Sequence, residues 1–110
     1  MKARIPGGMD KNAMMKRIQQ MQEDMERVQA EVESSSFTAS AGGGAVEAEV
    51  NGKHEVLAIR IQPDVVDPED VEMLQDMILV AVNEAIRKAS ETMDKGIEAA
   101  KGGLSIPGLF

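Results

Sequence analysis

The chain contains no cysteine, which excludes disulfides and thiolate metal sites and is compatible with a reducing compartment. It has no tryptophan or tyrosine, and its two aromatic residues are Phe37 and Phe110. Nucleic-acid recognition by stacking bases on aromatic rings is therefore disfavoured. No apolar run approaches the roughly 20 residues of a membrane span, and residues 1–9 lack the apolar stretch of a secretory signal. These absences indicate a cytoplasmic protein.

The length of 110 residues suits one domain and is too short for two ordinary ones. The apolar residues are rich in alanine, valine and methionine, so the core of a single copy would be thin. Small domains also bury a smaller fraction of their surface than large ones do. We therefore expect a second copy to cover the remaining apolar surface, which would make the protein a homodimer.

The formal net charge is −7, which by itself argues against binding DNA. The charges, however, are unevenly distributed. Residues 1–20 carry five bases against Asp10 alone, a local balance of +4, whereas residues 64–76 contain carboxylates and no base. The pattern is that of locally basic ends on an acidic body. The carboxylates of this acidic segment are Asp64, Asp67, Glu69, Asp70, Glu72 and Asp76.

A first long helix is predicted over residues 10–33, after a flexible arm at residues 1–9 that contains Pro6-Gly7-Gly8. Apolar residues recur there with spacings of 4, 3, 4, 3 and 4, which is the pattern of a narrow helix seam. Such a seam favours packing against other helices, within or between chains, over packing on the chain's own sheet. Its residues are Met14, Ile18, Met21, Met25, Val28 and Val32.

Three strands are predicted next. Residues 34–40 form a weak strand that ends at the glycine turn 42–44, and residues 46–50 alternate apolar and acidic. Asn51-Gly52 is typical of a two-residue hairpin turn. That turn would pair Val46 with Leu57 and Gly44 with Ile59, and it would place His54 opposite Glu49. The apolar faces of the two strands then coincide.

The second long helix is predicted from Asp67, as the cap before Pro68, to Lys101, with Gly96 as an alternative earlier end. It is too long to be covered by three strands, so its end should project. Residues 102–110 form a flexible apolar tail. The fold class is therefore α+β, an α-β-β-β-α order with a three-stranded antiparallel sheet and two long helices.

No constellation in the sequence points to catalysis, a metal or a cofactor. The glycine triplet continues as a strand and lacks the Gly-Lys-Ser/Thr of a phosphate loop. His54 is the only histidine, so a paired-histidine metal site is excluded. The carboxylates Asp64, Asp67 and Asp70 lack the ligand order of an EF-hand and suit helix capping better. We predict a protein that is not an enzyme.

The ordered set of segments resembles the YbaB/EbfC family. Residues 14–25 resemble its Met/Gln-rich opening helix, and residues 42–46 with 50–52 resemble its glycine turn and hairpin. Residues 59–63, 70–76 and 81–85 resemble its last strand and final helix, and the Ile-Pro-Gly of the tail is also similar. The resemblance covers roughly residues 10–108. It implies an intertwined homodimer with projecting helices, a nucleoid role and DNA binding without catalysis.

Two sets of candidate residues follow. Phosphate contacts would come from a set of bases near the start of the chain and along the last helix, although any one of them taken singly is better interpreted as a solvated charge beside a carboxylate. These bases are Lys2, Arg4, Lys11, Lys16, Arg17, Arg87, Lys88, Lys95 and Lys101. The candidate dimer interface consists of apolar residues of the first helix and of the third strand. These are Met14, Ile18, Met21, Met25, Val28, Leu57 and Ile59.

The main functional hypothesis is therefore a nucleoid-associated protein that binds duplex DNA with low sequence specificity as a homodimer. The alternative is an acidic interaction module whose helices and tail dock a recombination or replication protein without direct DNA contact. A membrane-surface role for residues 10–33 is disfavoured because the five carboxylates of that helix beyond position 22 would be repelled by anionic lipid.

Overall fold

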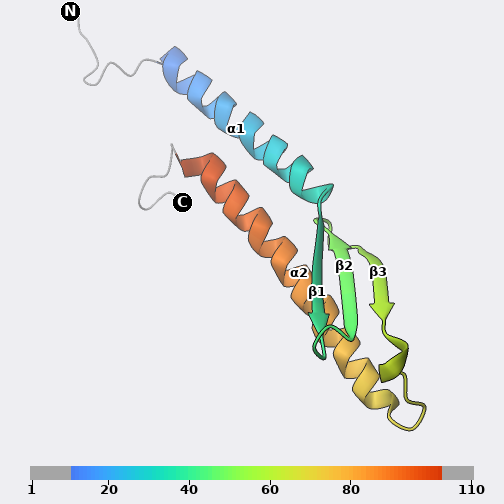
Figure 1. Cartoon of the computed structure of the whole chain (residues 1–110). Helices are drawn as coiled ribbons and strands as arrows, with labels where there is room; N and C mark the ends of the chain where they lie inside the picture. The colour runs from blue at the N-terminus through green and yellow to red at the C-terminus, as the bar shows by residue number, and fades with distance from the viewer. Residues whose placement is uncertain (1–10, 103–110) are drawn as a thin grey trace, which may run out of the picture.

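The computed structural model describes residues 11–102 and confirms the α-β-β-β-α order (Figure 1). Helix α1 (Lys11–Glu33) leads into strands β1 (Ser36–Ala41), β2 (Val46–Asn51) and β3 (Val56–Ile61). A short 3-10 turn, η2 (Pro63–Val65), precedes helix α2 (Val71–Lys101). The strands form one antiparallel sheet in the order β1-β2-β3. The predicted fold class is thus confirmed for a single copy. The predicted arm at residues 1–9, the cap Asp10 and the tail from residue 103 onward lie outside the described residues.

The core lies between the sheet and α2. Strand β2 buries alternate residues, as its pattern predicted, and α2 presents a row of alanines at i, i+4 spacing to the same layer. Because alanine has so short a side chain, α2 can approach the sheet closely. Seven fully or almost fully buried residues make up this core: Ala39, Val46, Ala48, Val50, Ala81, Ala85 and Ala89.

The glycine turn joins β1 and β2 as predicted. Gly42, Gly43 and Gly44 all have positive φ, at 63°, 67° and 94°, a region that residues with a Cβ rarely adopt. A Cβ on Gly42 would also meet the Met77 sulfur of α2 at 2.5 Å. The triplet therefore serves backbone geometry and close helix packing.

The predicted register of the β2–β3 hairpin is wrong. Val46 pairs with Ile61 and Ala48 with Ile59, with a bulge at Glu49/Val50, so the connection is longer than two residues. The Asn51 side chain is the physical reason: its Oδ1 accepts hydrogen bonds from the Lys53 and Glu55 backbone N–H groups at 2.9 and 3.0 Å. Over residues 46–49 the register shifts by four residues, an even number, so the apolar faces still coincide there.

Helix α2 begins later than predicted. Asp70 is its N-cap and accepts a hydrogen bond from the Met73 backbone N–H at 3.3 Å. Asp67 instead organises the preceding turn, where its carboxylate accepts from the Glu69 backbone N–H at 2.9 Å. The Asp67-Pro68 pair therefore forms a turn stabilised by an aspartate side chain, not the first turn of the helix.

Helix α2 then runs unbroken through Gly96 to Lys101, about 46 Å at 1.5 Å per residue. Its first half covers β1 and β2, and its second half projects beyond the sheet and packs antiparallel to α1 (Figure 1). Gly96 does not end the helix. It makes room for Val28, whose Cγ1 lies 2.6 Å from where a Cβ on Gly96 would stand.

Candidate nucleic-acid interface

The start of α1 and the end of α2 lie at the same end of the molecule, away from the sheet (Figure 1). It places bases that are about 80 positions apart in the chain in the same half of the molecule, with Lys11, Lys16 and Arg17 on the part of α1 that extends beyond the end of α2. Residues 11–22 of α1 contain three cations and no carboxylate, and residues 93–102 of α2 contain two cations and two carboxylates. We call the five cations the basic tip: Lys11, Lys16, Arg17, Lys95 and Lys101.

The acidic segment lies at the opposite end. Residues 64–76 include η2, the following turn and the start of α2, beyond the sheet. Two of their carboxylates have local structural roles, since Asp67 holds the turn and Asp70 caps α2. The described part of the molecule is therefore electrically polarised along its length, with a positive helical tip and a negative sheet end.

Two predicted phosphate contacts have partners within the chain. Arg87 lies between two carboxylates of its own helix, bonding Glu84 and, at 2.5 Å, Glu91. The hydrogen bond from Arg87 holds the pKa of Glu84 below its ordinary value, and the same bond raises the pKa of Arg87. The Nζ of Lys88 donates to the Thr38 carbonyl oxygen of β1 at 2.7 Å. Both bases thus make interactions within the folded chain.

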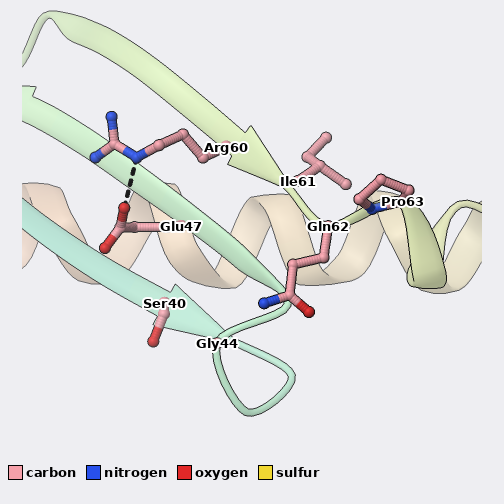
Figure 2. A pocket seen from close by; sticks show the side chains of 7 residues that line it. All are labelled: Ser40, Gly44, Glu47, Arg60, Ile61, Gln62 and Pro63. Carbon is pink, nitrogen blue, oxygen red and sulfur yellow. Dashed lines mark hydrogen bonds and ion pairs between the residues drawn. The ribbon is translucent and has the colours of Figure 1, made fainter.

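The outer face of the sheet, opposite α2, carries a third set of charges. Figure 2 shows Arg60 reaching across this face to Glu47, with Nε–Oε1 at 2.6 Å. Its Nη2 also donates to Glu49 at 3.2 Å. These bonds, first that to Glu47, raise the pKa of Arg60. A hollow of about 420 Å³ lies beside these bonds and is lined by Ser40 and Gln62 among others. It suits an anion poorly, because the Arg60 guanidinium is already bound by two carboxylates.

The structure separates four of the seven predicted dimer-interface residues into two groups, one on α1 and one on β3. Met25 and Val28 face the chain's own α2, where Val28 contacts Gly96 and Met25 borders a shallow hollow with Ile97. On the edge strand β3, Leu57 and Ile59 stay 53% and 40% exposed. They do so because α2 packs on β1 and β2 and leaves β3 uncovered.

Sequence reasoning left several exposed apolar residues out of the predicted interface, among them Ile61, Leu79 and Val80. Ile61 lies on the same side of β3 as Ile59, and Leu79 and Val80 of α2 are 59% and 57% exposed. A signal was available in the sequence, because residues 77–82 are six successive apolar residues. Such a run surrounds a helix on all sides, and one sheet covers only one of them. We call the three uncovered residues of β3, Leu57, Ile59 and Ile61, the apolar face.

His54 does not face Glu49, which corrects the prediction made from the two-residue turn. It has a positive φ of 68° in the hairpin loop, and its Nε2 lies 3.0 Å from the Ser90 Oγ of α2. The contact ties the hairpin to the helix. Within residues 11–102, no group of three or more histidine, aspartate or glutamate side chains is arranged to hold a metal ion. Lys2 and Arg4 lie outside the described residues.

The fold and the charge distribution define a small α+β protein that presents a cationic helical tip on an acidic body. The chain belongs to the YbaB/EbfC DNA-binding family, whose family model matches residues 7–104. It is 56% identical over 104 residues to a nucleoid-associated protein of Alkaliphilus metalliredigens, covering 94% of this chain and 91% of that protein. A nucleoid-associated protein of Clostridium novyi is 54% identical over the same length and coverage.

A solved structure shares the fold. The crystal structure of an uncharacterized protein from Helicobacter pylori has a TM-score of 0.65 to this chain at 22% identity, and the match covers 88% of this chain and 99% of that one. The α-β-β-β-α arrangement therefore recurs in an experimental structure. No helix of the described region is long and apolar enough to span a lipid bilayer.

Proposed function

We propose that this chain is a nucleoid-associated protein that binds duplex DNA with low sequence specificity, acting as a homodimer in the nucleoid. Its membership of a DNA-binding family and the names of its relatives support this role. The observation that carries the proposal is the basic tip, where two helix ends collect bases on an otherwise acidic chain.

The basic tip binds DNA by neutralising phosphates. Duplex DNA carries one negative charge per roughly 1.7 Å of helix axis, and each phosphate contact releases condensed counterions. At physiological salt, charges are screened beyond about 8 Å, so the tip contributes more to the local field than the net charge of −7 does. The acidic segment at the far end is repelled and therefore orients the tip toward the duplex. Contacts of this kind read backbone and shape, with little base discrimination.

A second copy completes the DNA-binding surface. The apolar face lies on the uncovered edge strand β3, and α2 exposes two further apolar residues, Leu79 and Val80. Burying such residues against a second copy removes apolar area from water, at about 25 cal/mol for each Å². The dimer then carries two basic tips on one acidic centre, and the attachment of one tip raises the effective concentration of the other.

The test is a fluorescence-anisotropy titration of the full chain against two unrelated duplexes over a series of salt concentrations. We expect similar affinities for the two sequences and a linear fall of log K with log salt, at about 0.9 per phosphate contacted. Replacing Arg17 with glutamine in both protomers should reduce that slope by about 2 in a dimer. The matched control is Lys53→Gln, which removes the same charge from the exposed hairpin loop and should leave the slope unchanged.

Equal effects of the two substitutions would show that only net charge matters and would remove the basic tip from the proposal. The absence of binding by the unchanged protein at low salt would reject DNA binding altogether.

The family assignment does not favour the alternative of an acidic interaction module that docks a recombination or replication protein. The family is described by DNA binding, and a role without catalysis is part of this proposal.

A further inference from the structure

The apolar seam of α1 continues beyond the end of α2. Val32 is 8% exposed, and Met25 and Val28 are half-buried against α2. Toward the start of the helix the exposure rises, to 40% at Ile18 and 49% at Met14. These last two residues repeat the same helical spacing, yet no described segment covers them.

The pairing of the two helices shows why α2 covers only part of the seam. Val28 lies opposite Gly96, and the helices run antiparallel with the same rise per residue. Ile18 and Met14 are therefore level with the points that a longer α2 would reach ten and fourteen residues beyond Gly96. Helix α2 ends at Lys101, so the chain that would extend over them is residues 103–110.

We propose that residues 104–110 dock back on the exposed seam of α1 in the same protomer. The segment contains Leu104, Ile106, Leu109 and Phe110 and has no charged side chain, so its composition matches an apolar seam. Eight residues beyond Gly102 reach about 26 Å when extended, whereas the seam from Met21 to Met14 measures only about 10 Å along the helix.

The chain's own tail has an advantage over any separate partner, because it is attached to the end of the helix that borders the seam. A short connection gives an effective concentration in the mM range. The docked tail leaves Lys16 accessible, because Lys16 is two residues from Ile18 and therefore on the far side of α1. The tail and a phosphate bound to Lys16 thus use different sides of the same helix.

Disulfide trapping tests the contact in a chain that has no cysteine of its own. In the full-length protein, the pair Ile18→Cys with Ile106→Cys is compared with the pair Gln20→Cys with Ile106→Cys under mild oxidation. Gln20 lies at the same height of α1 but on the opposite side. We expect the first pair to form an intramolecular disulfide at least about threefold faster than the second. Equal rates, or a disulfide that joins two chains, would overturn the proposal.

Methionine oxidation provides a second measurement without new cysteines. Met14 and Met73 are matched probes, 49% and 47% exposed at opposite ends of the molecule. In a full-length variant with Ile106→Ser, Leu109→Ser and Phe110→Ser, dilute peroxide should oxidise Met14 severalfold faster than in the unchanged protein, while Met73 keeps its rate. An unchanged rate at Met14, followed by mass spectrometry, would show that the tail does not cover the seam.

Discussion

At the scale of single residues, Gly52 connects two distant parts of the chain. It is buried in the hairpin loop, where a Cβ would overlap the Val32 carbonyl oxygen and lie 2.8 Å from the Glu33 Cα. The atoms that a Cβ would meet belong to the backbone, which cannot change rotamer as a side chain can. The loop therefore packs on the end of α1 only because this position has no side chain.

We predict that Gly52→Ala lowers the free energy of unfolding by about 2–3 kcal/mol, because it overpacks a rigid contact. Urea unfolding followed by circular dichroism, at one fixed protein concentration, measures the change. The control is Gly102→Ala, at a helical φ of −50° with open space around it, which should change stability by less than about 0.5 kcal/mol. If the two substitutions behaved alike, the close approach of the hairpin to α1 would be wrong.

Arg87 gives a prediction with a pH window. Its hydrogen bond lowers the pKa of Glu84 from an ordinary value of 4.5. A depressed carboxyl pKa stabilises the fold fully above the ordinary value, and this contribution is lost as pH falls through the lower folded value. Glu84→Gln should therefore lower the melting temperature slightly at pH 7 and make no difference in strong acid. A temperature deficit that persisted unchanged at low pH would indicate a packing effect instead.

At the scale of elements, the contact between α1 and α2 depends on one small residue. Val28 has a stiff, β-branched side chain in a helix, and its Cγ1 lies 2.6 Å from where a Cβ on Gly96 would stand. Two effects compete when Gly96 becomes alanine: helix propensity favours alanine by about 1 kcal/mol, and overpacking costs about 1–3 kcal/mol. The steric cost exceeds the propensity gain.

In a double-mutant cycle, the effect of Gly96→Ala on the free energy of unfolding should change sign between the two Val28 backgrounds. Gly96→Ala alone should lower the free energy of unfolding by about 1 kcal/mol. In a Val28→Ala background, where the obstacle is gone, the same substitution should raise it by up to about 1 kcal/mol. Thermal or urea unfolding of the four proteins yields the coupling free energy. Gly96→Ala would be stabilising in both backgrounds if the helices did not meet at this pair.

At the scale of the whole molecule, the apolar face predicts where two copies meet. Ile59 and Ile18 are each 40% exposed, so they form a matched pair of probes on β3 and α1. Ile59→Glu should shift the light-scattering mass from dimer toward monomer, because it places a charge in an apolar contact. Ile18→Glu should leave the mass of the dimer unchanged. The reverse outcome would return the interface to the seam of α1, where the heptad-like spacing alone had placed it.

Much of the fold was predictable because its signals are local. The spacing from Met14 to Val32 indicated α1, the alternation of residues 46–50 indicated β2, and the three glycines marked the turn before it. The hairpin connection was not predictable in the same way. Asn51-Gly52 suits a two-residue turn equally well, and the longer loop forms where Asn51 binds two backbone N–H groups and Gly52 packs on Val32.

The candidate site was predictable only in part. The sequence named all the bases of the described tip, but it grouped them with Arg87 and Lys88, whose partners became visible only in the fold. Glu84 and Glu91 lie one turn from Arg87, so that pairing was open to prediction from spacing. The Lys88 contact with Thr38 joins residues 50 positions apart, so no local sequence pattern predicts it.

By itself, the sequence determined the helices and strands, their order and the separation of basic from acidic segments, because periodicity, turn glycines and charge are properties of neighbouring residues. Only the tertiary structure decided which bases share a surface and which apolar residues stay uncovered. The antiparallel packing of α1 on α2 places both ends of the described chain at the same end of the molecule, and the position of α2 under β1 and β2 leaves β3 exposed. Both depend on contacts between residues far apart in the chain, whose partners are set by how whole elements pack.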